Sequence, residues 1–282
     1  MNTLTMQDST PALHYVEAPL NYLSDITTTP AAYMYTPPPG VPTRSGQYIA
    51  HTLPIFNGRV LRDQLSLDRH GFQLIRRETR VKNFYDSQEV KAIYYPEVEY
   101  LVRKFTGAAR VIAFDHNVRC GTLAKRGETG IREPVKIVHN DYTRKSGPQR
   151  LRDLLPTEEA GKLLQHRFAF INLWRPIRGP VQESPLAVCD ARSMSQGDFI
   201  PTDLVYRDRV GEIYSVVFSP SHRWFYFPQM QTDEALLLKG YDSMEDGRAR
   251  FTAHSAFDDP TTPPHAPARE SIETRTIVFF AS

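Results

Sequence analysis

The stretch Pro134–Asp141, PVKIVHND, joins a short apolar run to the triplet His139-Asn140-Asp141. Residues i and i+2 of an extended segment point to the same face, so His139 and Asp141 present an imidazole and a carboxylate to one point. Two histidines and one carboxylate on one face of an octahedron form the facial triad of non-haem iron(II) sites. The triplet therefore predicts two ligands of such a site and requires a third from elsewhere.

Two downstream histidines are candidates for the third ligand. His254 ends the run RFTAH, and His222 lies in the turn sequence SPSHRW. In a double-stranded β-helix the paired ligands open the second core strand and the distal histidine sits on the seventh. Counting strand candidates from His139 as strand two places His254 on strand seven. We favour His254, and His222 is kept as the alternative third ligand.

The strand candidates around the triplet predict a mainly β protein with flanking helices. Short runs rich in β-branched and aromatic residues are separated by turn-rich segments, as in a sandwich or jelly roll. The expected core is a double-stranded β-helix of the jelly-roll, cupin-like kind. The expected strands are 110–116, 134–138, 168–175, 185–189, 213–218 running toward 223–227, 234–241, 250–254 and 271–280.

The N-terminal part of the chain lacks this pattern. Residues 1–60 are expected to be an irregular N-terminal arm, because TPPPGVP at 36–42 cannot form a helix or a central strand. Residues 61–282 are expected to form a single double-stranded β-helix oxygenase domain. Within it, helical spacing of apolar residues predicts helices near 87–106, and a polar insertion is expected near 145–166.

The start of the last strand candidate offers a carboxylate-binding pair. A facial triad leaves positions open for O2 and for a chelating cosubstrate such as 2-oxoglutarate. The distal carboxylate of 2-oxoglutarate suits a guanidinium, which can donate two parallel hydrogen bonds. Arg269 and Ser271, two residues apart, are expected to bind it, with Arg275 and Arg175 as alternatives.

The aromatic group WFYF at 224–227 supplies the expected substrate-pocket residues. Its lack of polar alternation is typical of a strand buried on both faces, so core packing is the competing interpretation. Under the pocket interpretation, Trp224, Tyr226 and His222 contact the substrate.

Composition limits the classes of protein to which the chain can belong. Apolar residues make up 40% of the 282 residues and the net charge is +2, which is ordinary for a globular protein. The sequence lacks a basic block with interleaved aromatic residues, which would indicate nucleic-acid binding. No apolar run approaches the ~18 residues of a membrane span. The first residues do not show the pattern of a signal peptide, and two cysteines, Cys120 and Cys189, cannot form a disulfide framework. The chain is therefore expected to be cytoplasmic.

Longer blocks resemble a known family of enzymes. They extend from about residue 65 to 280 and include VIAFDHNVR, VHNDYT, NLWRPI, PLAVCDARS, ARFTAHSAFDDP and SHRWFYFPQMQTDEALLLKGYDS. They are similar to the fungal and bacterial hydroxylase/desaturase family of Fe(II)/2-oxoglutarate-dependent oxygenases. That family includes gibberellin-desaturase-like enzymes, a cephalosporin methoxylation protein and fungal secondary-metabolite oxygenases.

The resemblance implies Fe(II), 2-oxoglutarate and O2 as cofactors and cosubstrates. It implies oxidation of a small natural-product intermediate by hydroxylation, desaturation or ring formation, with release of succinate and CO2. His139 and Asp141 match the family's HxD motif, His254 matches by topology, and Arg269 matches the RxS position.

Three rival interpretations remain open. They are a metal-binding cupin-type isomerase or cyclase, a non-catalytic subunit, and a methyltransferase-associated subunit. A methyltransferase would need a glycine-rich nucleotide-binding turn between a strand and a helix, and the sequence has none. A homodimer is the oligomeric state expected for such a fold.

Overall fold

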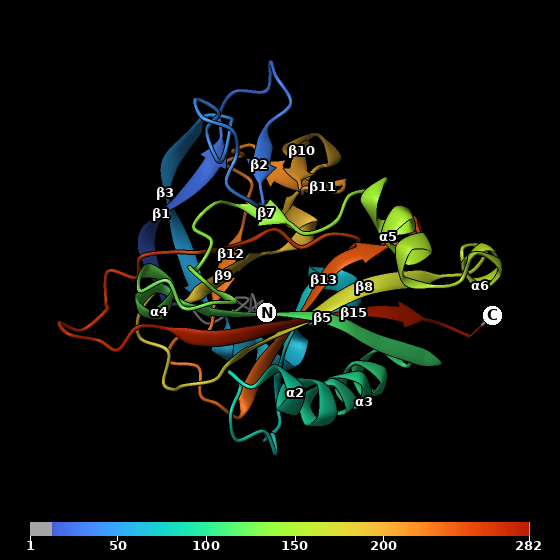
Figure 1. The fold of residues 1–282 in the computed structure, drawn as a ribbon. Helices are drawn as coiled ribbons and strands as arrows, with labels where there is room; N and C mark the ends of the chain where they lie inside the picture. Colours follow the sequence, from blue (N-terminus) through green and yellow to red (C-terminus); the bar gives the residue numbers. More distant parts are fainter. Residues whose placement is uncertain (1–12, 282) are drawn as a thin grey trace, which may run out of the picture.

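Residues 13–281 are described by the computed structural model, in which two β-sheets face each other as a jelly roll (Figure 1). The nine-stranded sheet of this part of the chain has the order β1-β3-β12-β9-β14-β7-β11-β10-β2. The six-stranded sheet has the order β4-β13-β8-β15-β5-β6. Neighbouring strands come from distant parts of the sequence, as expected for a double-stranded β-helix.

The strands of the described residues are β1 (Tyr15–Leu23), β2 (Ala31–Tyr33), β3 (Tyr48–Asn57), β4 (Phe72–Arg76), β5 (Arg110–Cys120), β6 (Ile131–Arg132), β7 (His139–Asn140), β8 (Phe168–Pro176), β9 (Leu186–Cys189), β10 (Phe199–Val205), β11 (Val210–Val216), β12 (Trp224–Tyr226), β13 (Glu234–Asp242), β14 (His254–Ala256) and β15 (Glu270–Phe279). The helices are η1 (Gly58–Gln64), α1 (Leu67–His70), α2 (Ser87–Glu89), η2 (Val90–Tyr94), α3 (Tyr95–Thr106), α4 (Gly121–Lys125), α5 (Ser146–Leu154), α6 (Thr157–Leu163), η3 (Ala191–Ser193) and η4 (Gln196–Asp198).

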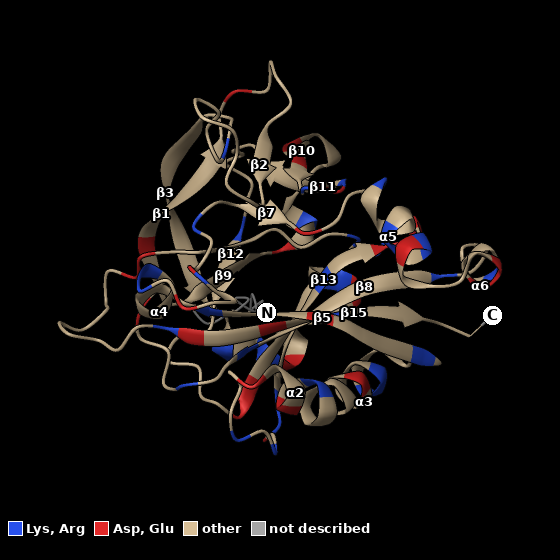
Figure 2. Ribbon diagram, viewed as in Figure 1, with Lys and Arg blue, Asp and Glu red and all other residues tan. Residues whose placement is uncertain are grey.

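One helical segment covers the outer face of the six-stranded sheet. Asp86 caps α2 by accepting from the backbone N–H groups of Gln88 and Glu89, and Gly107 ends α3 with φ 68°. Between these ends, Val98 and Val102 of α3 share one apolar cluster with Leu173 of β8. Residues of both signs of charge occur along α3 (Figure 2).

Alternation along the strands separates two apolar layers. In β8, Trp174 faces the interior and packs with Leu236 and Val188, so the interior layer joins both sheets. Leu173, its neighbour, faces the helices. This alternation fixes which polar side chains of the same strands point between the sheets.

The expectation of an irregular arm over residues 1–60 is wrong where the structure describes it. β1 and β3 form a nine-residue antiparallel ladder at the edge of the larger sheet, and β2 pairs with β10. These strands accommodate their own prolines, because Pro19 lies on an edge strand and Pro54 precedes the part of β3 that pairs with β12. The proline cluster at 36–42 lies between β2 and β3, and residues 1–12 lie outside the described part.

Other strand boundaries also differ from expectation. The run 134–138 forms almost no ladder, and the paired strand β7 consists of His139 and Asn140. His254 begins β14 where the sequence suggested that it ends a strand. The expected strand over 213–227 is two strands, β11 and β12, which lie apart in the same sheet. Residues 146–154 and 157–163 of the expected insertion form α5 and α6.

Candidate metal centre

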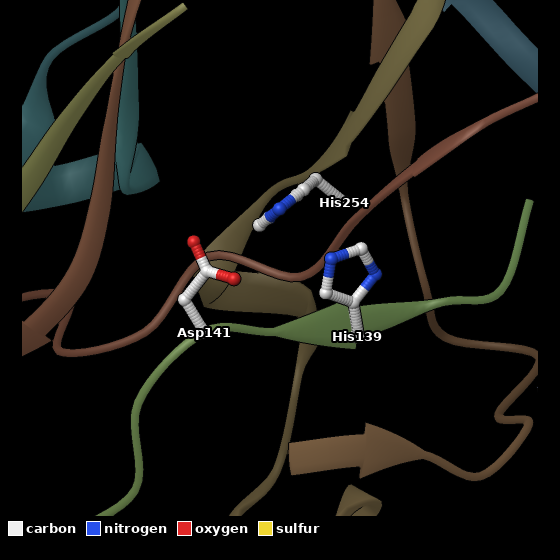
Figure 3. Close-up of side chains that lie close together, drawn as sticks. All are labelled: His139, Asp141 and His254. Carbon is white, nitrogen blue, oxygen red and sulfur yellow. The ribbon is translucent and has the colours of Figure 1, made fainter. Parts of the chain in front are cut away.

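His139, Asp141 and His254 converge between the two sheets (Figure 3). One ligand atom from each lies within 4.8 Å of the others, and the two imidazole centroids are 4.4 Å apart. β7 carries His139, Asp141 directly follows this strand, and the neighbouring β14 carries His254. Two imidazoles and one carboxylate are a donor set suited to a first-row transition metal such as Fe(II).

Backbone carbonyls fix how both imidazoles point. Nδ1 of His139 lies 2.7 Å from the carbonyl oxygen of Ile137, and Nδ1 of His254 lies 2.9 Å from that of Thr252. A carbonyl only accepts, so each Nδ1 carries the proton and donates it. The lone pair of each ring then resides on Nε2, which is the form that binds a metal.

The carboxylate of Asp141 is held through one of its two oxygens. Asn172 of β8 donates from Nδ2 to Oδ2 over 2.5 Å, and Nε of Arg275 lies 3.9 Å from the same oxygen. The same Nδ2 also donates to Glu273 of β15 over 2.7 Å. Both contacts involve Oδ2, so Oδ1 is the oxygen left to bind a metal.

The local field favours the metal-binding protonation states. Burial, followed by the neighbouring His254, lowers the pKa of His139 to about 3, so this imidazole is neutral at physiological pH. For Asp141, burial alone would raise the pKa, but Arg275 and the two histidines lower it further than burial raises it. The result is a neutral imidazole beside an ionised carboxylate.

The residue between the two ligands of the triplet has a structural role. Asn140 is fully buried, and its Nδ2 donates to the carbonyl oxygens of Tyr142 and Gly240. Its Oδ1 accepts from the backbone N–H of Thr252 over 3.0 Å. Asn140 therefore ties the HxD segment to the residue two positions before His254.

A narrow cleft next to the two histidines includes one member of the expected carboxylate-binding pair. Arg269 lines it together with His139 and His254. Within the described residues, Nε of Arg269 and Oγ of Ser271 are buried and have no hydrogen-bond partner. Buried polar atoms are normally paired, so these orphans fit a bound anion such as the distal carboxylate of 2-oxoglutarate. The free volume of the cleft, about 20 Å³, is near that of one water, so such an anion requires lining side chains to separate.

The alternative arginines lie elsewhere. Arg175 faces the helical layer, where it donates to the carbonyl oxygens of Arg77 and Thr232 and lies 5.5 Å from the Tyr94 ring. That position is on the opposite face of β8 from Trp174 and contradicts a cosubstrate role. Arg275 pairs with Asp115 over 2.8 Å and lies on the Asp141 side of the centre.

The expected substrate contacts are core residues. His222 stacks on Tyr22, and its two ring nitrogens lie 3.1 Å from the Tyr22 hydroxyl and an Asp198 carboxylate oxygen. Both nitrogens are thus engaged, which contradicts its roles as alternative third ligand and substrate contact. Trp224 and Tyr226 pack on the face of the sheet opposite Val188, the strand partner of His254. The prediction that these two residues contact the substrate is wrong, because strand alternation points their side chains away from the centre.

The sequence interpretation missed the cavity that does open beside the centre. It has a volume of about 540 Å³ and is lined by Asp141 and Arg275 together with residues of β5, α5, β10 and β11. It also missed Asn172, Glu273 and Arg119 on the inner face of the smaller sheet. Alternation in β5 and β15 could have indicated the last two, but nothing local distinguished them from surface charges.

A jelly roll that brings two histidines and an aspartate together beside a cleft lined by a buried arginine is typical of the class of non-haem iron(II), 2-oxoglutarate-dependent oxygenases. Comparison with known proteins gives the same class. The family model described as "YDMC: Oxidoreductase/YMDC permease-like domain" matches residues 20–279.

Two curated relatives cover most of the chain. The hydroxylase/desaturase efuI of Hormonema carpetanum is 38% identical over 77% of this chain and 79% of its own length. The Fe(II)/2-oxoglutarate-dependent dioxygenase nvfI of Aspergillus novofumigatus is 34% identical over 88% of this chain and 90% of its own length. A solved structure of the iron and alpha-ketoglutarate-dependent endoperoxidase NvfI superposes with a TM-score of 0.84 at 28% identity, covering 95% of this chain and 99% of that one.

The chain belongs to this family of Fe(II)/2-oxoglutarate-dependent dioxygenases and hydroxylase/desaturases. It is an enzyme that uses Fe(II), 2-oxoglutarate and O2, as the sequence predicted. The predicted jelly-roll fold is likewise confirmed. Within the described residues, no helix is both long and apolar enough to span a membrane.

Proposed function

We propose that His139, Asp141 and His254 hold Fe(II), and that Arg269 and Ser271 bind the distal carboxylate of 2-oxoglutarate. The observation that carries this proposal is the convergence of the three ligand atoms within 4.8 Å of one another. The unpartnered Nε of Arg269 and Oγ of Ser271 support the cosubstrate assignment. Bound iron would supply O2 activation coupled to conversion of 2-oxoglutarate to succinate and CO2.

The surrounding residues have distinct tasks in this proposal. The carbonyl oxygens of Ile137 and Thr252 keep Nε2 of each histidine directed at the metal position. Asn172 keeps Oδ2 of Asp141 occupied, so that this carboxylate offers the metal one oxygen. Fixed orientation of ligands by outer hydrogen bonds raises metal affinity and leaves coordination positions open for cosubstrate and O2.

The substrate is proposed to be a small natural-product intermediate of secondary metabolism, bound in the cavity of about 540 Å³ beside Asp141. This volume lies in the usual range of small-molecule pockets. Phe114, Tyr142 and Ile213 supply apolar wall, while Arg275 and Lys145 supply polar groups. The names of the relatives include hydroxylase/desaturase and endoperoxidase, so the outcome on this substrate is hydroxylation, desaturation or a related C–H oxidation.

One assay tests the whole proposal. Protein loaded with Fe(II) under anaerobic conditions is mixed with 2-oxoglutarate, candidate substrates and oxygen. We expect succinate to appear in step with substrate consumption. Substrate conversion without succinate would contradict the proposal and would instead indicate a cupin-type isomerase or cyclase.

We also propose a cytoplasmic homodimer, on the composition and the fold class alone. Light scattering of the purified chain gives its mass in solution, and a fluorescent fusion gives its compartment. A monomeric mass or an organellar signal would contradict the respective part.

A further inference from the structure

Arg119 on β5 lines the same cleft as Arg269, His139 and His254. It is the register partner of Ser271 across the β5–β15 pair, so the two side chains share one face of the sheet. Since Ser271 is buried between the sheets, Arg119 points inward as well. Two guanidinium groups, one from β5 and one from the residue just before β15, therefore line one narrow space.

Neither guanidinium has a carboxylate partner within ion-pair distance in the described residues. Arg119 donates from Nη1 to the carbonyl oxygen of Glu133 over 2.8 Å, and Arg269 donates from Nη1 to that of Ser184 over 2.5 Å. Glu273 lines the cleft too, but its recorded hydrogen bond comes from Asn172. Arg269 is buried and Arg119 is half-buried, and placing two such cations side by side without an ion-pair partner is costly in a low-dielectric interior. A dianion is the ligand that would balance them.

The electrostatics of the cleft agree with this geometry. Burial, and then repulsion from Arg119, lower the pKa of Arg269 to about 9. Burial lowers the pKa of Arg119, while Glu273 and Asp141 act to raise it. Its side chain lines the cleft beside His139 and His254 as well as beside Arg269.

We propose that Arg119 is a second cationic contact for 2-oxoglutarate, placed at the end of the cosubstrate that lies next to the metal. The inference rests on the proposed function, in which Arg269 and Ser271 hold the distal carboxylate. Arg119 then contacts the carboxylate of the 2-oxo acid group, and the two arginines together neutralise the dianion. The 2-oxo acid end is thereby oriented toward the two histidines before O2 enters.

Direct binding to the Mn(II)-loaded protein, measured by calorimetry, tests the proposal without turnover. The probes are 2-oxoglutarate and 2-oxobutyrate, which keeps the 2-oxo acid group but lacks the distal carboxylate. The variants are Arg119→Met, Arg119→Lys and Arg269→Met, with Arg132→Met as a matched control. Arg132 is the register partner of Arg119 on β6 and is exposed. Circular dichroism and Mn(II) affinity establish that each variant is folded and loaded.

We expect Arg119→Met to weaken both probes by at least about tenfold, since one charge-assisted contact is lost. Arg119→Lys restores part of that loss, Arg269→Met weakens 2-oxoglutarate alone, and Arg132→Met changes neither probe. Unchanged affinities in Arg119→Met would overturn the inference. So would a loss confined to 2-oxoglutarate, because Arg119 would then act at the distal carboxylate. Failure of the unaltered Mn(II)-loaded protein to bind 2-oxoglutarate would overturn the proposed function itself.

Discussion

His139 and His254 lie directly opposite each other across the antiparallel pair of β7 and β14, with ring centroids 4.4 Å apart. Opposed residues on neighbouring strands project to the same face, so this register brings the two imidazoles together. A slip of β14 by one residue would turn His254 to the opposite face. The proposed metal centre therefore depends on strand register as much as on the residues themselves.

Replacing either ligand of the HxD triplet should remove metal binding while the fold persists. His139→Ala and Asp141→Ala each delete one donor of a three-residue set, and the two remaining donors bind a divalent ion weakly. Titration with Mn(II), read by calorimetry, checks the loss, and circular dichroism checks the fold. His265→Ala, at an exposed histidine, is the control that should bind Mn(II) normally. Retained binding in His139→Ala would exclude this site.

Asn172→Leu should lower metal affinity by about 10–100-fold, the usual effect of losing a partner that orients a ligand. The amide of Asn172 donates to Oδ2 of Asp141, and without it the carboxylate rotates or binds through both oxygens. Asn83→Leu, at an exposed asparagine away from the centre, is the matched control. An Mn(II) dissociation constant unchanged in Asn172→Leu would show that packing alone positions Asp141.

Asn140→Ala should destabilise the protein by about 1–3 kcal/mol or more, because it leaves buried backbone groups unsatisfied. Nδ2 and Oδ1 of Asn140 join the HxD segment to Gly240 and Thr252. Urea unfolding measures the loss, and Mn(II) affinity should fall as well, since Thr252 positions His254 through its carbonyl oxygen. Unchanged stability and Mn(II) affinity in Asn140→Ala would show that the hydrogen bonds of Asn140 are not needed to hold β7 and β14 in register.

The pair of Glu234 and Arg59 should contribute stability that acid removes. Burial would raise the pKa of Glu234, but two hydrogen bonds from Arg59, at 2.7 and 2.9 Å, and one from the backbone N–H of Gln231 lower it below its ordinary 4.5. A carboxyl with a depressed folded pKa stabilises fully above its unfolded pKa, and this contribution is lost as pH falls through the folded pKa.

Glu234→Gln should therefore lower the free energy of unfolding at pH 7 by about 1–3 kcal/mol, and the difference from the unaltered protein should shrink below about pH 4.5. Urea titrations across this range provide the measurement. Glu128→Gln, at an exposed glutamate, should show no such pH-dependent difference. A difference that stays constant down to pH 3 would contradict the assignment.

Trp224→Ala should act on stability and leave cosubstrate binding intact. The indole is fully buried and donates from Nε1 to the hydroxyl of Tyr22 over 2.7 Å, on the sheet face away from the centre. Truncating such a core side chain costs about 3–5 kcal/mol. Urea unfolding should show this cost, while the affinity of folded, Mn(II)-loaded protein for 2-oxoglutarate stays unchanged. A stable variant with weakened 2-oxoglutarate binding would restore a pocket role to Trp224.

Sequence by itself determined the features that depend on local spacing. The i, i+2 relation of His139 and Asp141, and of Arg269 and Ser271, follows from the two-residue repeat of extended backbone. Helical spacing around 87–106 corresponds to α2, η2 and α3. The likeness of long blocks to an oxygenase family indicated the fold and cofactors that comparison with known proteins confirmed.

Only the tertiary structure decided which distant residues meet. His254 and His222 were both open as the third ligand until strand register placed one beside His139 and engaged the other with Tyr22 and Asp198. The substrate cavity and the inward position of Arg119 likewise arise from pairing between strands far apart in the chain. Local periodicity tells which face a side chain occupies along its own strand. It carries no information on which other strand will lie next to that face.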